Sequence, residues 1–557
     1  MAGRPLSQDD PQQSHTEQRW VWFLAAALTL AGFLFFLPSL NICFVSDDVS
    51  HILEAAENLA AIHRPYYRPL TELSLHLDRL VWRMHPFGFH LTNLVLHLAG
   101  TVLLLWVGVQ LGLNRMALSL AGLVFLVHPV HGPAIFWISG RTDLLCTLFY
   151  LLALGVFLAR LTGPRRFHRG VSLLFLLLAL LSKEMAVSFP LVAGAATWLL
   201  AGPTPRWKKL RQLWTQTSPY WLLVLLFILF RLLAAGSAAL SNPVHQGIHP
   251  LAWLRNGAAF AALLILPAGH RQLADWALDH PAALLVLGSL ALLSLWGLLA
   301  YARHRPVACF LILFTAFSLL PVLRFAMRWY AYLPSVGFAL LAGHLLAEGP
   351  AVLRRWRLPL GAAAAGLILV FAFFLHRQQQ AWIRVSEQAD ALADRLAEAI
   401  YRRQLPAAYV ALVPAEINDV PVFRYGLEKN IRYRVSRLAG RQSEVQVRAL
   451  SYARLNRLED LFLARIGWLG DSLEVDLRAI SSACFEFPYQ PAVLAGRVPL
   501  QPGLSLHRPE AETRILKAIR PDCATRVAVR PRYSGLPVLT LLKNAVALVE
   551  PDSLAEK

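Results

Sequence analysis

The feature that most constrains this chain is a series of long apolar runs, with most charged residues confined to the short segments between them. A helix needs about 20 apolar residues to cross a bilayer, because lipid offers no partner to an unpaired backbone group. Of the 557 residues, 56% are hydrophobic and 16% are charged, and the mean hydropathy is +0.48. This balance excludes an ordinary soluble protein and predicts an α-helical polytopic membrane protein.

The apolar runs predict about eleven membrane spans. They lie near 20–40, 89–111, 116–131, 133–160, 170–182, 184–201, 219–237, 281–301, 307–322, 330–347 and 358–375. The stretch 251–267 carries Arg255 and ends in Pro267, which favours a re-entrant or interfacial helix. The runs that end at His128 and Lys183 are too short to cross a bilayer of about 30 Å, so their ends are expected to line a water-filled cavity.

Basic clusters set the expected orientation, since Lys and Arg near span ends stay on the cytoplasmic side. The clusters stand at 160–169, 206–211, 303–305 and 354–357. Alternation of the spans then gives a cytoplasmic tail at 1–19, a transmembrane domain at 20–378 with a first outer loop at 41–88, and an extracytoplasmic domain at 379–557. The formal net charge of +19 is attributed to topology signals, so no nucleic-acid partner is expected.

Residues 379–557 are expected to form a small extracytoplasmic α/β domain. A helix near 380–404 precedes segments whose apolar residues alternate as in strands. These segments are 407–417, 444–450, 472–480 and 525–531. Among the five cysteines, Cys484 and Cys523 are the one pair expected to be able to form a disulfide, and the spacings contain no zinc-binding pattern.

Ionisable residues gather at the expected outer ends of the spans. Such residues are costly at membrane depth and are functional candidates by default. A shielded carboxylate suits a general base, for which Asp47 and Asp48 are the candidates. A departing phosphate needs cationic or phenolic donors, and the candidates are Arg141, Lys183, Arg328 and Tyr330. Supporting residues are Asp143, Glu184, Arg68, His90, His128 and His131.

These two kinds of group together suit transfer of a sugar from a polyprenyl phosphate to a hydroxyl, with the lipid entering between helices. No glycine-rich nucleotide loop argues for a soluble donor. No cofactor is required by this reading, although Asp47, Asp48 and His51 also suggest a divalent cation. Hard cations want more oxygen ligands than this cluster offers, so metal dependence stays open.

Structural alternatives stand beside each functional interpretation. The paired aspartates could cap the helix that starts near Val49. Lys183 and Glu184 could neutralise each other at a helix end. The histidines could be hydrogen-bonded residues of the bundle. Arg328 could anchor at the lipid headgroups, as arginines near span ends often do.

Six ordered motifs resemble those of the membrane-embedded GT-C glycosyltransferases. The likeness is greatest to the transmembrane O-mannosyltransferases that carry tetratricopeptide repeats, and to their bacterial relatives. The motifs are FVSDDVSHI (44–52), YYRPLTELSLHLDRL (66–80), GFHLTNLVLHL (88–98), HPVHGPAIFWISGRTDLL (128–145), SKEMAVSFPLV (182–192) and RWYAYLPSVGF (328–338). The resemblance implies a polyprenyl or dolichyl phosphate sugar as donor, inversion, a bacterial inner membrane and a first-loop aspartate as base, with Asp48 preferred over Asp47.

The chain also departs from this family in two ways. Met327 stands where relatives have an acidic residue before the arginine of the last motif, and residues 385–557 lack a 34-residue repeat. The acceptor is therefore open among protein, lipid and glycan. A transporter or flippase of lipid-linked saccharide is the alternative function, but it would place its polar residues near the midplane between two related halves.

Overall fold

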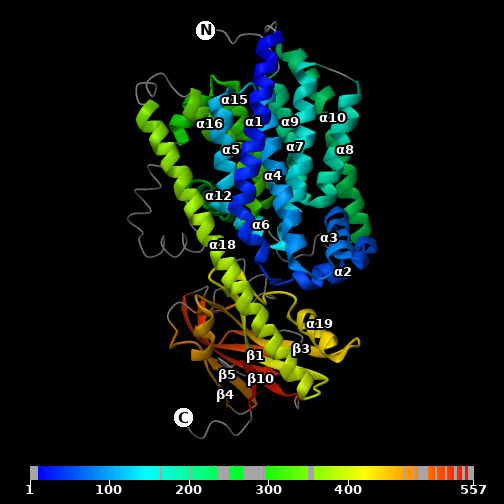
Figure 1. Ribbon diagram of the computed structural model, residues 1–557, viewed down its shortest axis with the longest axis vertical. Helices are drawn as coiled ribbons and strands as arrows, with labels where there is room; N and C mark the ends of the chain where they lie inside the picture. The colour runs from blue at the N-terminus through cyan, green and yellow to red at the C-terminus, as the bar shows by residue number, and fades with distance from the viewer. Residues whose placement is uncertain are drawn as a thin grey trace.

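The protein consists of a bundle of helices and a domain of β-strands, which one long helix connects (Figure 1). The computed structural model describes residues 11–64, 66–163, 166–200, 204–235, 250–267, 293, 295–324, 326–348, 357–469, 471–480, 483–486, 500–507, 511–520, 523–531, 536–541 and 546–549. Most of the expected span at 281–301 and most of the basic cluster at 354–357 lie outside these residues.

Six helical segments among the described residues are long and apolar enough to cross a membrane. They are Arg19–Asn41, Pro86–Gln110, Ile138–Leu161, Arg206–Ala235, Arg328–Glu348 and Gly361–Arg402. Each overlaps one expected span. The helices themselves are α1 (Pro11–Phe36), α4 (Pro86–Gln110), α5 (Arg115–Val127), α6 (Gly132–Phe136), α7 (Arg141–Thr162), α8 (Arg166–Ser182), α9 (Phe189–Leu200), α10 (Arg206–Ala235), α12 (Pro250–Ile265), α15 (Pro306–Leu319), α16 (Tyr332–Glu348) and α18 (Arg357–Arg402).

The other expected spans are shorter. Arg115–Val127 and Pro129–Phe136 together make a seventh candidate, with a bend of 42°. The shorter apolar helices are His168–Ser182, Glu184–Leu200, Ala252–Ile265 and Pro306–Val322. Six or seven crossing helices are thus supported by length and composition, out of the eleven expected. The expected span at 133–160 begins later than predicted, because Gly132–Phe136 forms the separate short helix α6.

Short 3₁₀ turns interrupt the bundle where the motifs lie. They are η2 (Pro129–His131), η3 (Ile138–Gly140), η4 (Glu184–Ser188) and η7 (Arg328–Ala331). Proline contributes to one of these breaks, since Pro129 cannot continue the hydrogen bonding of α5. The two runs expected to stop short do so: α5 ends one residue before His128, and α8 ends one residue before Lys183.

Two amphipathic helices of the first loop lie at the edge of the bundle that faces the β-strands (Figure 1). They are α2 (Asp48–Ala60) and α3 (Pro69–Trp82). Arg68 precedes Pro69 with φ −128° and ψ 63°, outside the helical region. This is the bend expected before a proline.

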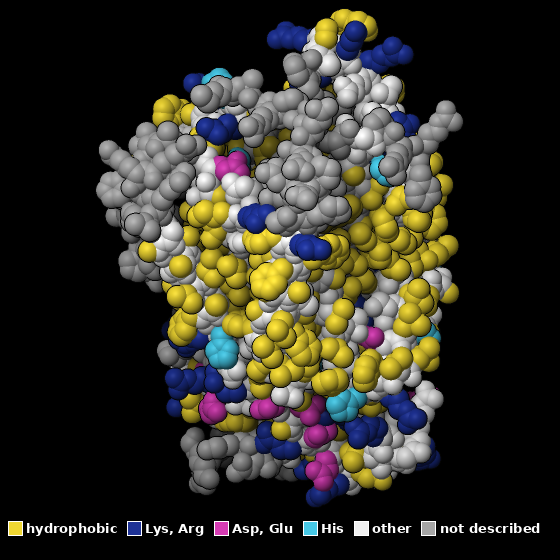
Figure 2. Space-filling model, turned by 45° about the horizontal axis from the view of Figure 1, so that its top comes forward, with side chains coloured by type: hydrophobic (Ala, Val, Ile, Leu, Met, Phe, Trp, Pro, Cys, Tyr) yellow, Lys and Arg dark blue, Asp and Glu magenta, His cyan; other side chains and the backbone are white. Residues whose placement is uncertain are grey.

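The outer surface of the bundle is hydrophobic. Figure 2 shows a broad hydrophobic surface over the bundle, with acidic and basic side chains gathered at its lower edge. Large side chains on α1 and α10 are exposed, including Trp22 at 71% and Trp214 at 70%. A contiguous apolar surface of this size is typical of contact with lipid, which supports a multi-pass membrane protein.

Helix α18 is continuous over 46 residues, from the bundle into the C-terminal domain. The span expected at 358–375 and the helix expected near 380–404 are therefore one element, and the proposed boundary at 378 falls inside it. Helix α19 (Leu427–Ala439) packs against α18. Arg434 of α19 donates hydrogen bonds to Asp390 and Asp394 of α18.

The C-terminal domain contains two sheets. One has the order β11-β10-β1-β3-β6, with β2 paired to β1, and the other has the order β4-β5-β9-β8-β7. The strands are β1 (Ala407–Ile417), β2 (Val420–Pro421), β3 (Gln446–Leu455), β4 (Arg465–Leu469), β5 (Ser472–Asp476), β6 (Cys484–Glu486), β7 (Ser505–His507), β8 (Ala511–Arg520), β9 (Cys523–Pro531), β10 (Val538–Leu541) and β11 (Val546–Leu548). Each of the four segments expected to be a strand overlaps one, and β1 matches its prediction residue for residue.

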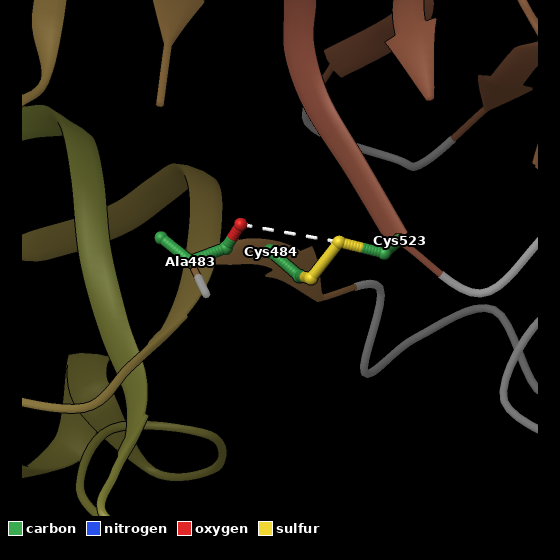
Figure 3. Close-up of a disulfide and its surroundings, with 3 residues drawn as sticks. All are labelled: Ala483, Cys484 and Cys523. Carbon is green, nitrogen blue, oxygen red and sulfur yellow. Dashed lines mark hydrogen bonds between the residues drawn. A yellow bond between two sulfur atoms is a disulfide. The ribbon is translucent and has the colours of Figure 1, made fainter. Parts of the chain in front are cut away.

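The expected disulfide between Cys484 and Cys523 is present, with an S–S distance of 1.89 Å (Figure 3). It links the end strand β6 of the first sheet to β9 of the second. The two sheets are therefore joined covalently as well as by packing. The other three cysteines, Cys43, Cys146 and Cys309, are free thiols.

Candidate functional site

The two first-loop aspartates differ in their access to solvent. Asp48 begins α2 and is fully buried, and its Oδ2 accepts a hydrogen bond of 3.0 Å from the Val45 amide. Asp47 precedes the helix and keeps 17% of its side chain exposed. Asp47 holds the N-cap position of α2, yet its side chain makes no capping hydrogen bond. Helix capping therefore does not account for Asp47, which leaves its carboxylate available for chemistry.

Ser139 joins the aspartates to His51. Its Oγ lies 3.0 Å from Asp47 Oδ1, 3.5 Å from Asp48 Oδ1 and 3.0 Å from His51 Nδ1. The His51 ring also lies 3.4 Å from Asp47, and 38% of its side chain is exposed. Asp47 thus sits in a small polar cluster at the solvent boundary, held by groups from η3 and α2.

Burial raises the pKa of Asp48 well above its ordinary value, and the nearby charge of Asp47 raises this pKa further. Hydrogen bonds from Val45 and Ser139 act in the opposite direction and are outweighed. Two adjacent carboxylates resist ionising together. Burial and the neighbouring charge therefore both favour the neutral form of Asp48.

Glu72 of α3 is a third carboxyl group in this region. Burial raises its pKa, while the nearby charge of His51 lowers it by less. Among the described residues no group of three or more His, Cys, Asp or Glu side chains is arranged to hold a metal ion.

Two ion pairs connect the remaining motifs. Arg68 donates hydrogen bonds of 2.6 and 3.1 Å to Glu184. Lys183 Nζ lies 2.7 Å from both carboxylate oxygens of Asp143, and both side chains are almost fully buried. The structural alternative, in which Lys183 and Glu184 neutralise each other, is therefore not what the structure shows. Each is paired with a residue from another motif.

Tyr330 and two tryptophans form an aromatic wall beside these pairs. Lys183 Nζ lies 4.6 Å from the centre of the Tyr330 ring, within the range of a cation–π contact. Trp329 lies edge-on to Tyr330 and to Trp137, with ring centres 5.8 and 5.5 Å apart. Both the last motif and the fourth motif in the chain thus contribute rings to this wall.

Arg328 is nine-tenths buried beside this wall. Within the part of the chain that the structure describes, it has no hydrogen-bond or ion-pair partner. The carboxylates whose charges act on it are Asp419 and Glu416, both from the C-terminal domain. Asp419 lies in the turn between β1 and β2, so the C-terminal domain supplies negative charge near an arginine whose preceding residue, Met327, is uncharged.

Arg141 connects α3 and α4 through hydrogen bonds in the interior of the bundle. It is fully buried, and it donates hydrogen bonds of 2.8 Å to Asn93, 2.7 Å to the Phe89 carbonyl and 2.5 Å to Asp78. A further contact of 3.2 Å reaches Ser74. Its donor groups are therefore engaged by α3 and α4. This geometry favours a structural role for Arg141 over the phosphate binding suggested by the sequence.

The candidate histidines are residues of the bundle interior. His128 Nε2 lies 2.9 Å from the Leu264 carbonyl, and its Nδ1 accepts from the Val130 amide. His131 Nε2 lies 2.7 Å from Ser335 Oγ. His90 is buried near Arg141. None of the three belongs to the cluster around Asp47. The hydrogen bonds favour the structural interpretation for His128 and His131, whereas both ring nitrogens of His90 have no hydrogen-bond partner among the described residues.

Several residues of this region were not singled out in the sequence. Ser139 lies inside a recognised motif, but a serine carries no signal of its own until its neighbours are placed. Asp78 and Trp137 likewise gain their roles from long-range contacts with Arg141 and Trp329. Asp419 comes from a domain that shares none of the six motifs, so no local pattern pointed to it.

No family model matches the chain. The protein O-mannosyl-transferase Tmtc1 of Drosophila melanogaster is 34% identical over 188 residues, covering 30% of this chain and 22% of that protein. The protein O-mannosyl-transferase TMTC4 of Homo sapiens is 41% identical over 101 residues, covering 16% of this chain and 14% of that protein. This chain therefore spans less than a quarter of the length of either relative.

Among solved structures, the oligosaccharyltransferase of Archaeoglobus fulgidus, tethered to an acceptor peptide with an NVT sequon, matches with a TM-score of 0.42 and 12% identity. The match covers 78% of this chain and 64% of that one, and it is too weak to bear on the fold. The resemblance that the motifs predicted is confirmed: the chain is similar to the protein O-mannosyl-transferases over part of its length.

Proposed function

We propose that this protein is a membrane glycosyltransferase that moves a sugar from a polyprenyl phosphate to a hydroxyl acceptor, with inversion and with Asp47 as the base. One observation carries the proposal: a partly exposed carboxylate, Asp47, shares Ser139 with a buried one, Asp48. Asp47 replaces Asp48 as the preferred base, because a base must reach the proton it removes. Asp48 is fully buried and accepts a hydrogen bond from its own turn.

In this mechanism Asp47 accepts the proton of the acceptor hydroxyl as the acceptor oxygen bonds to the anomeric carbon. The bond from that carbon to the phosphate oxygen breaks at the same time, and its electron pair leaves with the polyprenyl phosphate. Ser139 and His51 fix the orientation of the Asp47 carboxylate. A single displacement of this kind inverts the anomeric centre.

The departing phosphate gains negative charge that a cation must stabilise. Arg328 is the cation best suited to this role, because its donor groups are not taken by other described residues. Lys183 and Arg68 are already paired with Asp143 and Glu184. They add positive charge nearby, and Tyr330 supplies a hydroxyl beside them.

The proposed orientation places the site and the C-terminal domain on the extracytoplasmic face of a bacterial inner membrane. The disulfide between Cys484 and Cys523 supports this side, since disulfides persist in oxidising compartments. The acceptor is a protein, a lipid or a glycan.

The test uses the full-length protein in detergent with a panel of radiolabelled polyprenyl phosphate sugars and acceptors of the three classes. We expect the wild type to transfer sugar from one donor, and Asp47→Asn to lose at least about 100-fold in kcat, as expected for a general base. Asp471→Asn is the matched control, because that aspartate is 61% exposed in the C-terminal domain and pairs with Arg530.

Two outcomes contradict the proposal. The base assignment fails if Asp47→Asn transfers sugar as fast as Asp471→Asn. The activity itself fails if the wild type carries lipid-linked saccharide across a vesicle membrane and transfers none of it to any acceptor. The second outcome would instead support the flippase alternative.

A further inference from the structure

The C-terminal domain touches the chain directly beside Asp47. The Ser46 amide donates a hydrogen bond of 2.6 Å to the carbonyl of Val422, which follows β2. Ser46 itself has φ 52°, a left-handed conformation that residues other than glycine seldom adopt. A contact from outside the loop is therefore needed to hold this conformation.

Gly426 makes a second backbone contact with the same turn. It has φ +78° and stands at the N-cap of α19. A Cβ built on it would lie 2.9 Å from the Ser46 carbonyl oxygen and 3.1 Å from the Asp47 Cα. Backbone atoms cannot swing aside as a flexible side chain can, so any larger residue at this position must displace the Asp47 turn.

Further contacts hold the two regions together around this point. Lys429 of α19 forms an ion pair with Glu54 of α2. The Cys43 amide donates a hydrogen bond of 3.0 Å to Ser386 of α18. The aspartate loop is therefore attached to the C-terminal domain before, at and after Asp47.

The segment that contacts Asp47 is itself rigidly held. Arg424 lies between Val422 and Gly426, and it is buried with hydrogen bonds of 3.0 Å to Glu416 and 2.7 Å to Glu486. Glu486 is two residues from Cys484, whose disulfide fixes β6 to β9 (Figure 3). A continuous series of contacts thus runs from the disulfide to the turn that holds Asp47.

We infer that the C-terminal domain positions the catalytic base, with the Val422 carbonyl and Gly426 as positioning groups for Asp47. This inference rests on the proposed function of Asp47. Neither residue touches the reacting atoms. They fix the Ser46–Asp47 backbone, and a displacement of about 1 Å in a reacting group can lower a rate about 100-fold.

Gly426→Ala tests this inference, with Gly440→Ala as its matched control. Gly440 caps the other end of α19 with φ +64°, and a Cβ there would meet nothing within 4 Å. Both changes place an alanine in a left-handed conformation, but one of them lies against Asp47. We expect Gly426→Ala to lower kcat about 100-fold with KM for the donor changed less than about twofold, while Gly440→Ala keeps kcat within about twofold.

A second measurement does not depend on sugar transfer. Hydrogen exchange in the full-length protein should be faster for the segment 44–50 in Gly426→Ala than in Gly440→Ala, because the hydrogen bond from Ser46 is weakened. Equal kcat values in the two variants would overturn the positioning role. If the wild type transfers no sugar, equal exchange in the segment 44–50 would overturn it independently of the proposed activity.

Discussion

Ion pairs are arranged differently in the helical bundle and in the C-terminal domain. In the bundle, one cation meets one acid from a distant motif, as in the buried pair Lys183–Asp143 and the partly exposed pair Arg68–Glu184. In the C-terminal domain, the single cation Arg424 is buried between two acids, Glu416 and Glu486. The bundle pairs thus hold helix ends together around the candidate site, whereas the C-terminal cluster holds one segment rigid so that it can support Asp47.

The largest effect on stability is expected from Arg424→Met. Burial opposes the charge of Arg424, but Glu486 and Glu416 raise its pKa above the ordinary value, so this arginine is firmly charged. Its loss removes the guanidinium that forms ion pairs with two buried carboxylates. We expect a loss of about 5 kcal/mol, the upper end of the range for a broken buried pair, measured by thermal unfolding in detergent.

The triple variant with Glu416→Gln and Glu486→Gln should recover most of that stability. If Arg424→Met lowers the free energy of unfolding by no more than the removal of one acid in the bundle does, the two regions do not differ in this way.

A smaller effect is expected from Asp143→Asn in the bundle. This change leaves one buried ammonium, Lys183, beside a neutral amide that still accepts a hydrogen bond. We expect a loss of about 3 kcal/mol, and recovery when Lys183→Met is added, because removing both charges also removes the cost of burying them. If Asp143→Asn alone unfolds with the same free energy as the wild type, Lys183 and Asp143 do not form a buried ion pair.

The sequence predicted local elements more completely than the contacts between them. Strand β1 follows from the alternation of its apolar residues, and the early stops at His128 and Lys183 follow from the length of the apolar runs. The ion-pair partners of Lys183 and Glu184 could not be predicted from the sequence. Lys183 is extended, with φ −162° and ψ 141°, so it and its neighbour point to opposite sides and each meets a different motif.

The candidate site shows the same limit. Both aspartates were identified from the motif, but which one is buried depends on the turn at Ser46, and that turn is held by Val422 from 376 residues further along the chain. No property of the first loop alone encodes this contact. The continuity of α18 was missed because its polar second half follows an apolar first half, and the change in composition resembles a domain boundary.

The smallest expected effect is a change in pH dependence. The pKa of Asp48 is raised in the folded protein by burial and by Asp47, so the folded state keeps this proton at pH values where the unfolded state has lost it. The resulting stability is complete below the ordinary pKa of about 4 and is lost as the pH rises through the folded pKa. Asp48→Asn is neutral at every pH.

The stability of Asp48→Asn relative to the wild type should therefore increase as the pH is raised from about 4 to 8, measured as the difference between the two thermal midpoints. A constant difference over that range would mean that Asp48 is ionised in the folded protein as readily as in the unfolded chain. The contrast between the two aspartates would then lose its electrostatic basis.

The most direct test of the account is the ratio of kcat for Asp47→Asn and Asp48→Asn, measured in the full-length protein with saturating donor. We predict that Asp47→Asn loses at least about 100-fold, as a general base should, and that Asp48→Asn loses less than about tenfold. The reverse order, or two variants that both transfer sugar at the wild-type rate, would contradict the assignment of Asp47 as the base.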